Sequence, residues 1–338
     1  MNFQVFRHIE QYKSYKYFCE DNSLFYECFW KKVFNYIQKF IPSYIHPNYI
    51  TISSIFVIIV TYFLDNFLNS SLFFSFGIIY YMLADGVDGT HARETKQTSI
   101  IGEHLDHVGD SIISGFLLDR ILTNIGFEND INKLNLILLS SLYFSKTHFD
   151  SINIKKIKYN LHEDISSFLV LCSIINYFKP NIFIITNFIY DFFNYYSFGI
   201  LNKIFGIQIF NFIIFSIPSL SFYFNMLKNV TKNKNKQDYL MLNKFDAINS
   251  FIYVFYYFCK LLIFLFNFKF YPLINIIDAY LIFSLINSKI FESFIDYKII
   301  IFILIFTLIN PLLTCFITVL LTYYYIYDIY QKLNLKNN

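Results

Sequence analysis

Four aspartates with the spacing of metal ligands lie within one short segment of the sequence. Asp85 and Asp88 are three residues apart, and Asp106 and Asp110 are four residues apart. In helices, each pair therefore shares one face. Carboxylates brought together in an apolar surrounding repel one another by roughly several kcal/mol, so their stable packing requires cations. Because oxygen ligands select hard ions, the pattern predicts Mg²⁺ or Mn²⁺, with two ions about 3.5–4 Å apart that would polarise a pyrophosphate.

The residues around these aspartates are small or basic. Those with little or no side chain are Gly86, Gly89, Ala92 and Gly102. They allow neighbouring helices and a nucleotide to approach closely. Arg93 supplies a planar pair of donors for a phosphate group. A single aspartate near a membrane interface is most simply a solvated charge, but four at helical spacing beside an arginine favour phosphate chemistry.

The composition of the chain indicates a protein embedded in a membrane. Of its 338 residues, 56% are hydrophobic and only 15% are charged, whereas a soluble globular protein carries about 25% charged residues. This excludes an ordinary soluble enzyme and, for most of the length, a disordered chain. The net charge of +3 is too small to imply a nucleic-acid partner. The five cysteines show no CxxC spacing, which indicates neither a disulfide framework nor a zinc site.

We therefore expect an all-α, polytopic integral membrane protein. Apolar runs of about 17–25 residues predict about ten membrane-spanning helices. These are expected near residues 48–66, 70–90, 103–124, 134–152, 163–179, 206–227, 247–267, 272–290, 295–310 and 312–330. The last two are separated by Asn310-Pro311. Segment 180–205 stays open as a lumenal loop, an interfacial helix or a further span.

Lysines in the loops set the predicted orientation. The predicted inner loops 153–162 and 228–246 are rich in lysine, whereas Lys133 is the only cation in the predicted outer loops near 67–69 and 125–133. Because positive loops stay in the cytosol, both chain ends and the aspartate segment are expected to face the cytosol.

The first 46 residues differ from the rest, because they interleave charged residues with aromatic ones. This pattern predicts amphipathic helices on the membrane surface, with Trp30, Lys31 and Lys32 at the depth of the headgroups. The predicted organisation is a juxtamembrane segment 1–46, a transmembrane domain 47–331 and a cytosolic tail 332–338.

The aspartate segment resembles the signature of the CDP-alcohol phosphotransferase family, D-x2-D-G-x2-A-R-x8-G-x3-D-x3-D. All of its fixed positions are filled, by Asp85, Asp88, Gly89, Ala92, Arg93, Gly102, Asp106 and Asp110. The resemblance implies transfer of a phospho-alcohol from a CDP-alcohol to an acceptor hydroxyl, with release of CMP. It implies that the four aspartates hold the metal ions. It also implies contacts to the CDP-alcohol from Gly89, Ala92, Arg93 and Gly102.

Other residues are similar to those of eukaryotic choline/ethanolamine phosphotransferases, over residues 9–115. The L-G-E-x-x-D-H-x-x-D-S of that subgroup is matched by Ile101-Gly102-Glu103, Asp106-His107 and Asp110-Ser111. The upstream landmarks are Tyr15-Lys16-Tyr17, Phe29-Trp30 and His46-Pro47-Asn48-Tyr49-Ile50-Thr51. The resemblance implies CDP-choline and CDP-ethanolamine as donors and diacylglycerol as acceptor. It further implies a homodimer in the membrane of the endoplasmic reticulum or the Golgi.

A base must take the proton of the acceptor hydroxyl. The wider family implies Asp110 for this role, while the choline/ethanolamine subgroup favours Glu103 and His107. A histidine has an unperturbed pKa of about 6.5, which suits His107 to the task. His91 and His104 have spacings that place them away from the aspartate face or in the turn.

Some roles and two other functions remain open. His148 and His162 flank an inner loop, where a solvated role and one beside choline fit equally. Another CDP-linked transferase, such as phosphatidylinositol synthase, is disfavoured by Glu103 and by the Asp106-His107 pair. An ion-coupled transporter or channel would use carboxylates spread across the depth of the bilayer, whereas here they are concentrated beside an arginine.

Overall fold

The computed structural model describes residues 19–21, 23–68, 71–124, 157–159, 273, 275–291 and 296–335, with individual residues between 137 and 151, at 171 and between 248 and 260. Several predictions lie outside the described residues: segment 180–205, the span 206–227, His162, and the span 163–179 apart from residue 171. Large parts of the spans 134–152 and 247–267 also lie outside them. The total of about ten spans and the domain boundaries therefore stay predictions.

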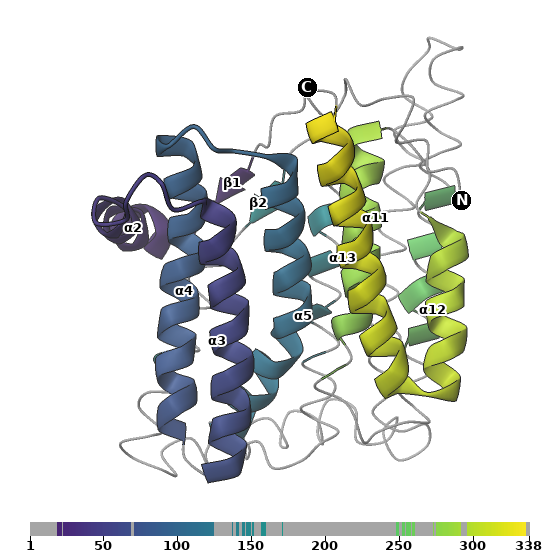
Figure 1. Cartoon of the computed structure of the whole chain (residues 1–338). Coiled ribbons are helices and arrows are strands. Elements are labelled where there is room, and N and C mark those ends of the chain that lie inside the picture. Colours follow the sequence, from purple (N-terminus) through teal and green to yellow (C-terminus); the bar gives the residue numbers. More distant parts are fainter. Residues whose placement is uncertain are drawn as a thin grey trace, which may run out of the picture.

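The described elements are almost all helices (Figure 1). In chain order they are β1 (Cys19–Asp21), the π-helical η2 (Tyr26–Trp30), α2 (Lys31–Gln38), α3 (Pro47–Leu68), α4 (Ser71–Glu94), α5 (Ile100–Asn124), β2 (Ile157–Tyr159), α11 (Asp278–Phe291), α12 (Tyr297–Ile309) and α13 (Pro311–Leu335). The predicted helical architecture is confirmed. One addition is a short parallel pair of β1 and β2, with Cys19 opposite Ile157.

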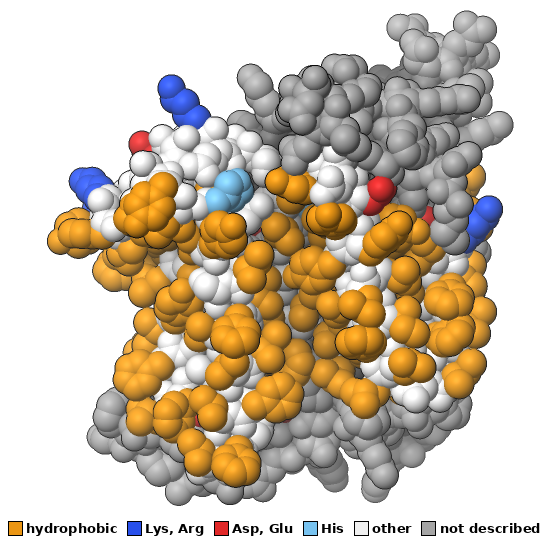
Figure 2. Space-filling model, viewed as in Figure 1, with side chains coloured by type: hydrophobic (Ala, Val, Ile, Leu, Met, Phe, Trp, Pro, Cys, Tyr) orange, Lys and Arg blue, Asp and Glu red, His pale blue; other side chains and the backbone are white. Residues whose placement is uncertain are grey.

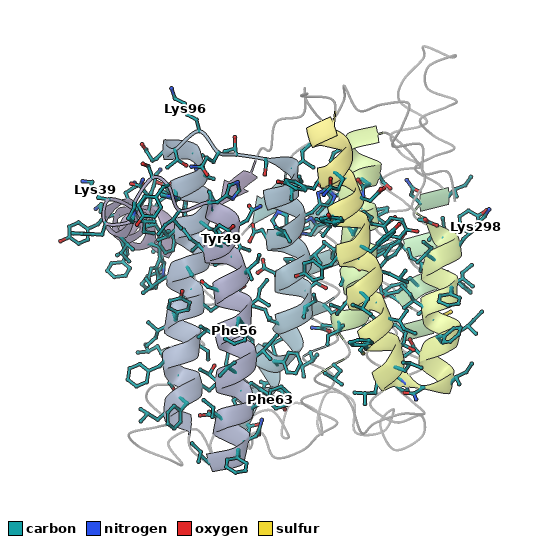
Figure 3. All side chains as sticks on the ribbon, viewed as in Figure 1. Lys39, Tyr49, Phe56, Phe63, Lys96 and Lys298 are labelled. Carbon is teal, nitrogen blue, oxygen red and sulfur yellow. The ribbon has the colours of Figure 1, made fainter. Side chains whose placement is uncertain are left out.

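The long helices run side by side along a common direction, while α2 lies across them beside α4 (Figure 1). Pro47–Leu68 and Pro311–Gln331 are long and apolar enough to cross a membrane, and Asn275–Ser288 and Tyr297–Thr307 are shorter apolar helices. Tyr49, Phe56 and Phe63 recur every seventh residue along an exposed face of α3 (Figure 3). Figure 2 shows that hydrophobic side chains cover this view of the upright helices, as expected of a surface in contact with lipid.

Helices α4 and α5 extend beyond the predicted apolar runs. Helix α4 continues to Glu94 instead of ending near residue 90, and α5 begins at Ile100 instead of residue 103. The signature up to Arg93 therefore lies inside a helix and not in a turn. The length of the apolar run underestimates the length of the helix, because a helix keeps its backbone hydrogen bonds where its side chains become polar.

A tight turn joins α4 to α5 and makes them antiparallel neighbours. Lys96 adopts a left-handed φ of 59°, and Gln97 N donates to Ala92 O over 2.9 Å, which closes the end of α4. The side chain of Gln97 donates to Ser43 O over 3.0 Å and so fastens the turn to the segment before α3. The last turns of α4 consequently face the first turns of α5.

Close approach at two glycines brings neighbouring helices against this pair. A Cβ at Gly109 of α5 would overlap Ile55 of α3, and a Cβ at Gly86 of α4 would overlap Phe34 of α2. Phe34 is buried and stacks on Trp30 at 5.6 Å between ring centroids. Gly86 therefore makes room for a helix. The expected position of α2 at the membrane surface stays a prediction.

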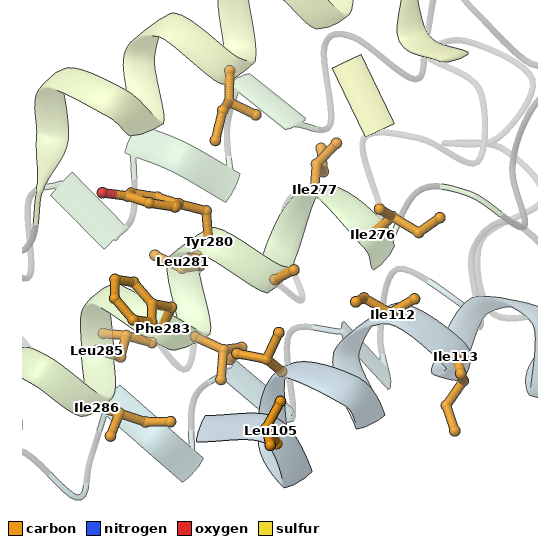
Figure 4. Packing of buried hydrophobic residues seen from close by; sticks show 14 of the residues in the cluster. Leu105, Ile112, Ile113, Ile276, Ile277, Tyr280, Leu281, Phe283, Leu285 and Ile286 are labelled. Carbon is orange, nitrogen blue, oxygen red and sulfur yellow. The ribbon is translucent and has the colours of Figure 1, made fainter. Parts of the chain in front are cut away.

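The apolar core is centred on α11, whose side chains Leu281, Ile282 and Leu285 are fully buried. Figure 4 shows this helix beside α5, with Leu105 and Ile112 of α5 in the same buried cluster. Just before α11, the carbonyl oxygen of Asn275 accepts a hydrogen bond from Ser111 Oγ over 3.1 Å. Its Nδ2 donates to Ser114 Oγ over 2.8 Å. The core thereby fixes the helix that carries two of the aspartates.

The predicted break at Asn310-Pro311 is confirmed. Asn310 has an extended backbone and separates α12 from α13. Its side-chain oxygen accepts from Leu313 N over 3.0 Å, as an N-cap does. Pro311 occupies the first position of α13, where a missing N–H costs nothing.

Two buried acids in this bundle are paired with basic residues. Lys260 Nζ lies 2.6 Å from Asp278 Oδ2 at the start of α11, and neither side chain is exposed by more than 3%. Tyr256 donates to the other oxygen of Asp278 over 2.5 Å, and Ser141 donates to the carboxylate as well. The second acid is Asp65, near the end of α3 at Leu68. Its Oδ2 lies 3.1 Å from Nε of Arg120 in α5.

Candidate active site

Three aspartates meet where α4 and α5 face each other. Asp85, Asp106 and Asp110 each offer one carboxylate oxygen, and these oxygens all lie within 4.8 Å of one another. The pairing follows from the antiparallel helices, because Asp85 lies about two turns before the end of α4 and Asp106 about two turns after the start of α5. The chain thus concentrates negative charge at one point.

This donor set fits a hard divalent cation. Oxygens that share one Mg²⁺ lie about 2.1 Å from it, and so are separated by roughly 3–4 Å, close to the spread seen here. In addition, Asp106 Oδ1 is buried and receives no hydrogen bond from the residues that the structure describes. A bound cation would satisfy that oxygen and relieve the repulsion among the three carboxylates.

The fourth predicted ligand, Asp88, is not among these three oxygens. Asp88 is buried, and its Oδ2 accepts a hydrogen bond from the hydroxyl of Thr51 in α3. Tyr81 donates to Asp110 Oδ1 over 2.7 Å from one turn before Asp85. Sequence reasoning gave no role to Thr51 or Tyr81. Tyr81 lies four residues before Asp85 and so shares its face of α4, which the sequence could have shown. The contact of Thr51 with Asp88 depends instead on how α3 packs against α4.

The predicted nucleotide-contacting residues lie next to this cluster on the same two helices. The Arg93 guanidinium is exposed and donates from Nη2 to Thr90 Oγ1 over 3.2 Å. A Cβ at Gly89 would lie 3.4 Å from Arg93 Nη1, and one at Gly102 would lie 3.3 Å from Asn48 Oδ1. The missing side chain at Gly89 therefore leaves space directly beside the arginine. Ala92 is half-buried within the same turn of α4.

The three candidate bases all lie on α5, where Glu103 and His107 are buried and Asp110 is half-buried. Glu103 precedes His107 by about one helical turn. His107 Nδ1 lies 3.9 Å from Asp106 Oδ2. The ring of His148 packs on His107 with 4.5 Å between centroids, so His148 belongs to this buried region and not to a solvated loop.

The two histidines that were expected to be uninvolved make backbone contacts. His91 Nε2 donates to Ile45 O over 2.9 Å, which ties α4 to the segment before α3. His104 Nδ1 bonds to Ile100 O over 2.8 Å within α5. Neither ring nitrogen used in these bonds is directed at the three aspartates, and both contacts account for the burial of these rings.

Comparison with known proteins agrees with this geometry. Residues 44–189 match the CDP-alcohol phosphatidyltransferase family. Choline/ethanolaminephosphotransferase 1 of Saccharomyces cerevisiae is 33% identical over 150 residues, which cover 41% of this chain and 38% of that protein. Cholinephosphotransferase 1 of the same yeast is 28% identical over 149 residues, 39% of this chain and 37% of the relative.

A third relative, from Dictyostelium discoideum, carries the name uncharacterized CDP-alcohol phosphatidyltransferase class-I family protein 3. It is 27% identical over 115 residues, 31% of this chain and 29% of its own length. The chain thus spans well under half of the length of each of these relatives. The matched residues contain α3, α4 and α5 with all four aspartates. Residues 44–189, which hold this cluster, therefore carry the match to the CDP-alcohol phosphatidyltransferase family.

Proposed function

We propose that this chain transfers phosphocholine or phosphoethanolamine from CDP-choline or CDP-ethanolamine to diacylglycerol, with release of CMP. The observation that carries the proposal is the meeting of Asp85, Asp106 and Asp110 inside the family domain. Members of this family act on CDP-alcohols and lipid acceptors in membranes and use divalent metals. The similarity to the two yeast proteins supports the choline or ethanolamine head group. The proposed compartment is the membrane of the endoplasmic reticulum.

In this proposal the aspartate cluster holds the divalent cation. Asp85, Asp106 and Asp110 are its ligands, and Thr51 orients the nearby Asp88. The bound metal supplies positive charge for the pyrophosphate and for the leaving oxygen of CMP. Arg93 donates to a phosphate oxygen, and the missing side chain at Gly89 gives the nucleotide access to it.

The acceptor hydroxyl loses its proton in the same step. Its oxygen forms a bond to the β-phosphorus, and the bond from that phosphorus to the bridging oxygen breaks, so that CMP departs with the electron pair. His107 or Glu103 takes the proton, because both lie on α5 within about one turn of Asp106. Burial of both side chains keeps bulk water from competing with the lipid hydroxyl.

The alternative of an ion pathway is disfavoured by two other buried acids, each of which is paired with a basic residue. Asp278 is paired with Lys260 and Asp65 with Arg120. Both acids are therefore held in fixed ion pairs, and they do not extend the α4–α5 cluster into a chain of open carboxylates across the bilayer.

The test uses membranes from cells that lack their own transferase activity and express the wild-type chain, Asp106→Ala or Asp119→Asn. Each is given diacylglycerol, Mg²⁺ or Mn²⁺, and labelled CDP-choline or CDP-ethanolamine. We expect labelled phospholipid from the wild type, none from Asp106→Ala and none with EDTA. Asp119→Asn is the matched control, because Asp119 lies on the same helix, binds Tyr62 OH over 2.8 Å, and keeps an acceptor as asparagine.

The ratio of the two labelled products identifies the preferred head group. Folded protein that forms no product from either donor would refute the proposal. Product from CDP-diacylglycerol and inositol in the same membranes would then move the chain to a phosphatidylinositol synthase within the same family.

A further inference from the structure

One side chain from outside the signature packs directly on a candidate base. His148 is 1% exposed, and its ring centroid lies 4.5 Å from that of His107, with 67° between the ring planes. Phe144, about one helical turn before His148, lies 4.9 Å from His148 and 6.5 Å from His107 between centroids. The three rings thus meet edge to face, an arrangement that aromatic rings favour.

This ring cluster confines His107. Its Nδ1 lies 3.9 Å from Asp106 Oδ2. The rings of His148 and Phe144 both pack against the His107 ring. Because side chains in a close-packed interior rotate only when their neighbours yield, the direction of the His107 ring depends on His148.

The helical residues that carry His148 are themselves anchored. Phe149 stacks on Tyr253 with 4.7 Å between centroids and 21° between planes. Ser145 Oγ lies 3.1 Å from the hydroxyl of the same tyrosine. Ser141, four residues before Ser145, hydrogen-bonds with Lys260 and Asp278 in a buried network. His148 therefore projects from a fixed support toward His107.

We propose that His148 is a positioning residue for the acceptor step: its ring holds His107 beside Asp106 in the direction that the acceptor hydroxyl requires. The inference rests on the proposed function, in which His107 takes the proton of that hydroxyl. The role is one of shape, so a flat ring of similar size at this position is sufficient.

Three variants test this role in purified full-length protein. His148→Ala should lower kcat by about 10- to 100-fold, as loss of a supporting side chain does, and leave KM for the CDP-alcohol within about twofold. His148→Phe, which keeps a flat ring, should restore kcat to within about threefold of the wild type. In a His107→Ala background, His148→Ala should cause no further loss, because two residues that act as one unit are not additive.

Four results would overturn the inference. Two are a normal kcat in His148→Ala and a His148→Phe enzyme that is as slow as His148→Ala. The others are a rise in the KM of His148→Ala for the CDP-alcohol that matches its loss of kcat, and additive losses in the double variant.

Thermal midpoints in detergent monitor folding. If His148→Ala is unfolded, His148→Leu fills the volume without a flat ring and is expected to fold and remain slow. Normal activity in His107→Ala alone would remove the base assignment and this inference with it. A wild-type protein inactive with both donors marks failure of the proposed function instead, and the variants are then measured on the CDP-alcohol that it uses.

Discussion

Two acidic sites in this protein, one of three half-buried aspartates and one of a single buried aspartate, are balanced in opposite ways. Asp85, Asp106 and Asp110 crowd within 4.8 Å of one another. Tyr81 donates a hydrogen bond to Asp110 over 2.7 Å, and His107 Nδ1 lies 3.9 Å from Asp106 Oδ2. Asp278 instead has Lys260 at 2.6 Å and accepts hydrogen bonds from tyrosine and serine hydroxyls.

The difference separates a binding role from a structural one. Where the chain supplies the cation, the carboxylate is satisfied and fixes the helices around it. Where three carboxylates crowd together, the folded state keeps repulsion that an external cation would remove. Substitutions in the two groups should therefore change activity and stability in opposite patterns.

The largest effect is expected for Asp106→Asn. Loss of a metal ligand should reduce transfer by at least about 1000-fold, or about 4 kcal/mol of transition-state stabilisation. The same change should raise the thermal midpoint of the metal-free protein in EDTA, because it removes one of three crowded charges. Added Mn²⁺ should raise the midpoint of the wild type but not of the variant. Near-normal turnover, or a midpoint that falls, would contradict the comparison.

Lys260→Met should show the opposite pattern. It leaves Asp278 buried and uncompensated, which costs about 3–5 kcal/mol of unfolding free energy. The double variant Lys260→Met/Asp278→Asn should recover most of that loss, since the asparagine still accepts from Tyr256. Mn²⁺ should not restore the single variant. Chemical denaturation in detergent measures each step, and a double variant no more stable than the single one would argue against a compensated pair.

Thr51→Val should have an intermediate effect. It removes the hydroxyl that donates to Asp88, and a hydrogen bond to a charged group contributes about 1.5–3 kcal/mol. We expect kcat/KM for the CDP-alcohol to fall by about tenfold or more, with Thr51→Ser close to the wild type. If the serine variant is as impaired as the valine variant, the methyl group and not the hydroxyl is what matters.

The smallest effect is expected at an exposed pair. Lys31 Nζ lies 3.0 Å from Glu27, and both side chains are about half exposed. The hydrogen bond and charge of Glu27 raise the pKa of Lys31, so any stabilisation would be present at neutral pH and lost only when the pH rises through that raised value. Because water screens such pairs, Glu27→Gln should leave the thermal midpoint at pH 7 unchanged. A clear drop would show that these residues are buried in the membrane-bound state.

Local sequence rules predicted most of the site region. Helical spacing alone placed Asp106 and Asp110 on one face of a helix. Three long apolar runs predicted α3, α4 and α5 at nearly their observed positions. The same rules could not show that Asp88 bonds to Thr51, because that contact depends on the packing of α3. Nor could they decide between a solvated role and one beside choline for His148, whose ring is buried against His107.

The sequence by itself determined which functional groups the site contains. These are carboxylates, small residues and an arginine at fixed spacing on two consecutive apolar helices. These are properties of residues near one another in the chain, where helix geometry converts spacing into direction. Only the tertiary structure decided which aspartates meet, which buried acid is neutralised by Lys260, and which ring supports His107. Those contacts join helices far apart in sequence, and they are set by how the side chains of the whole bundle fill space together.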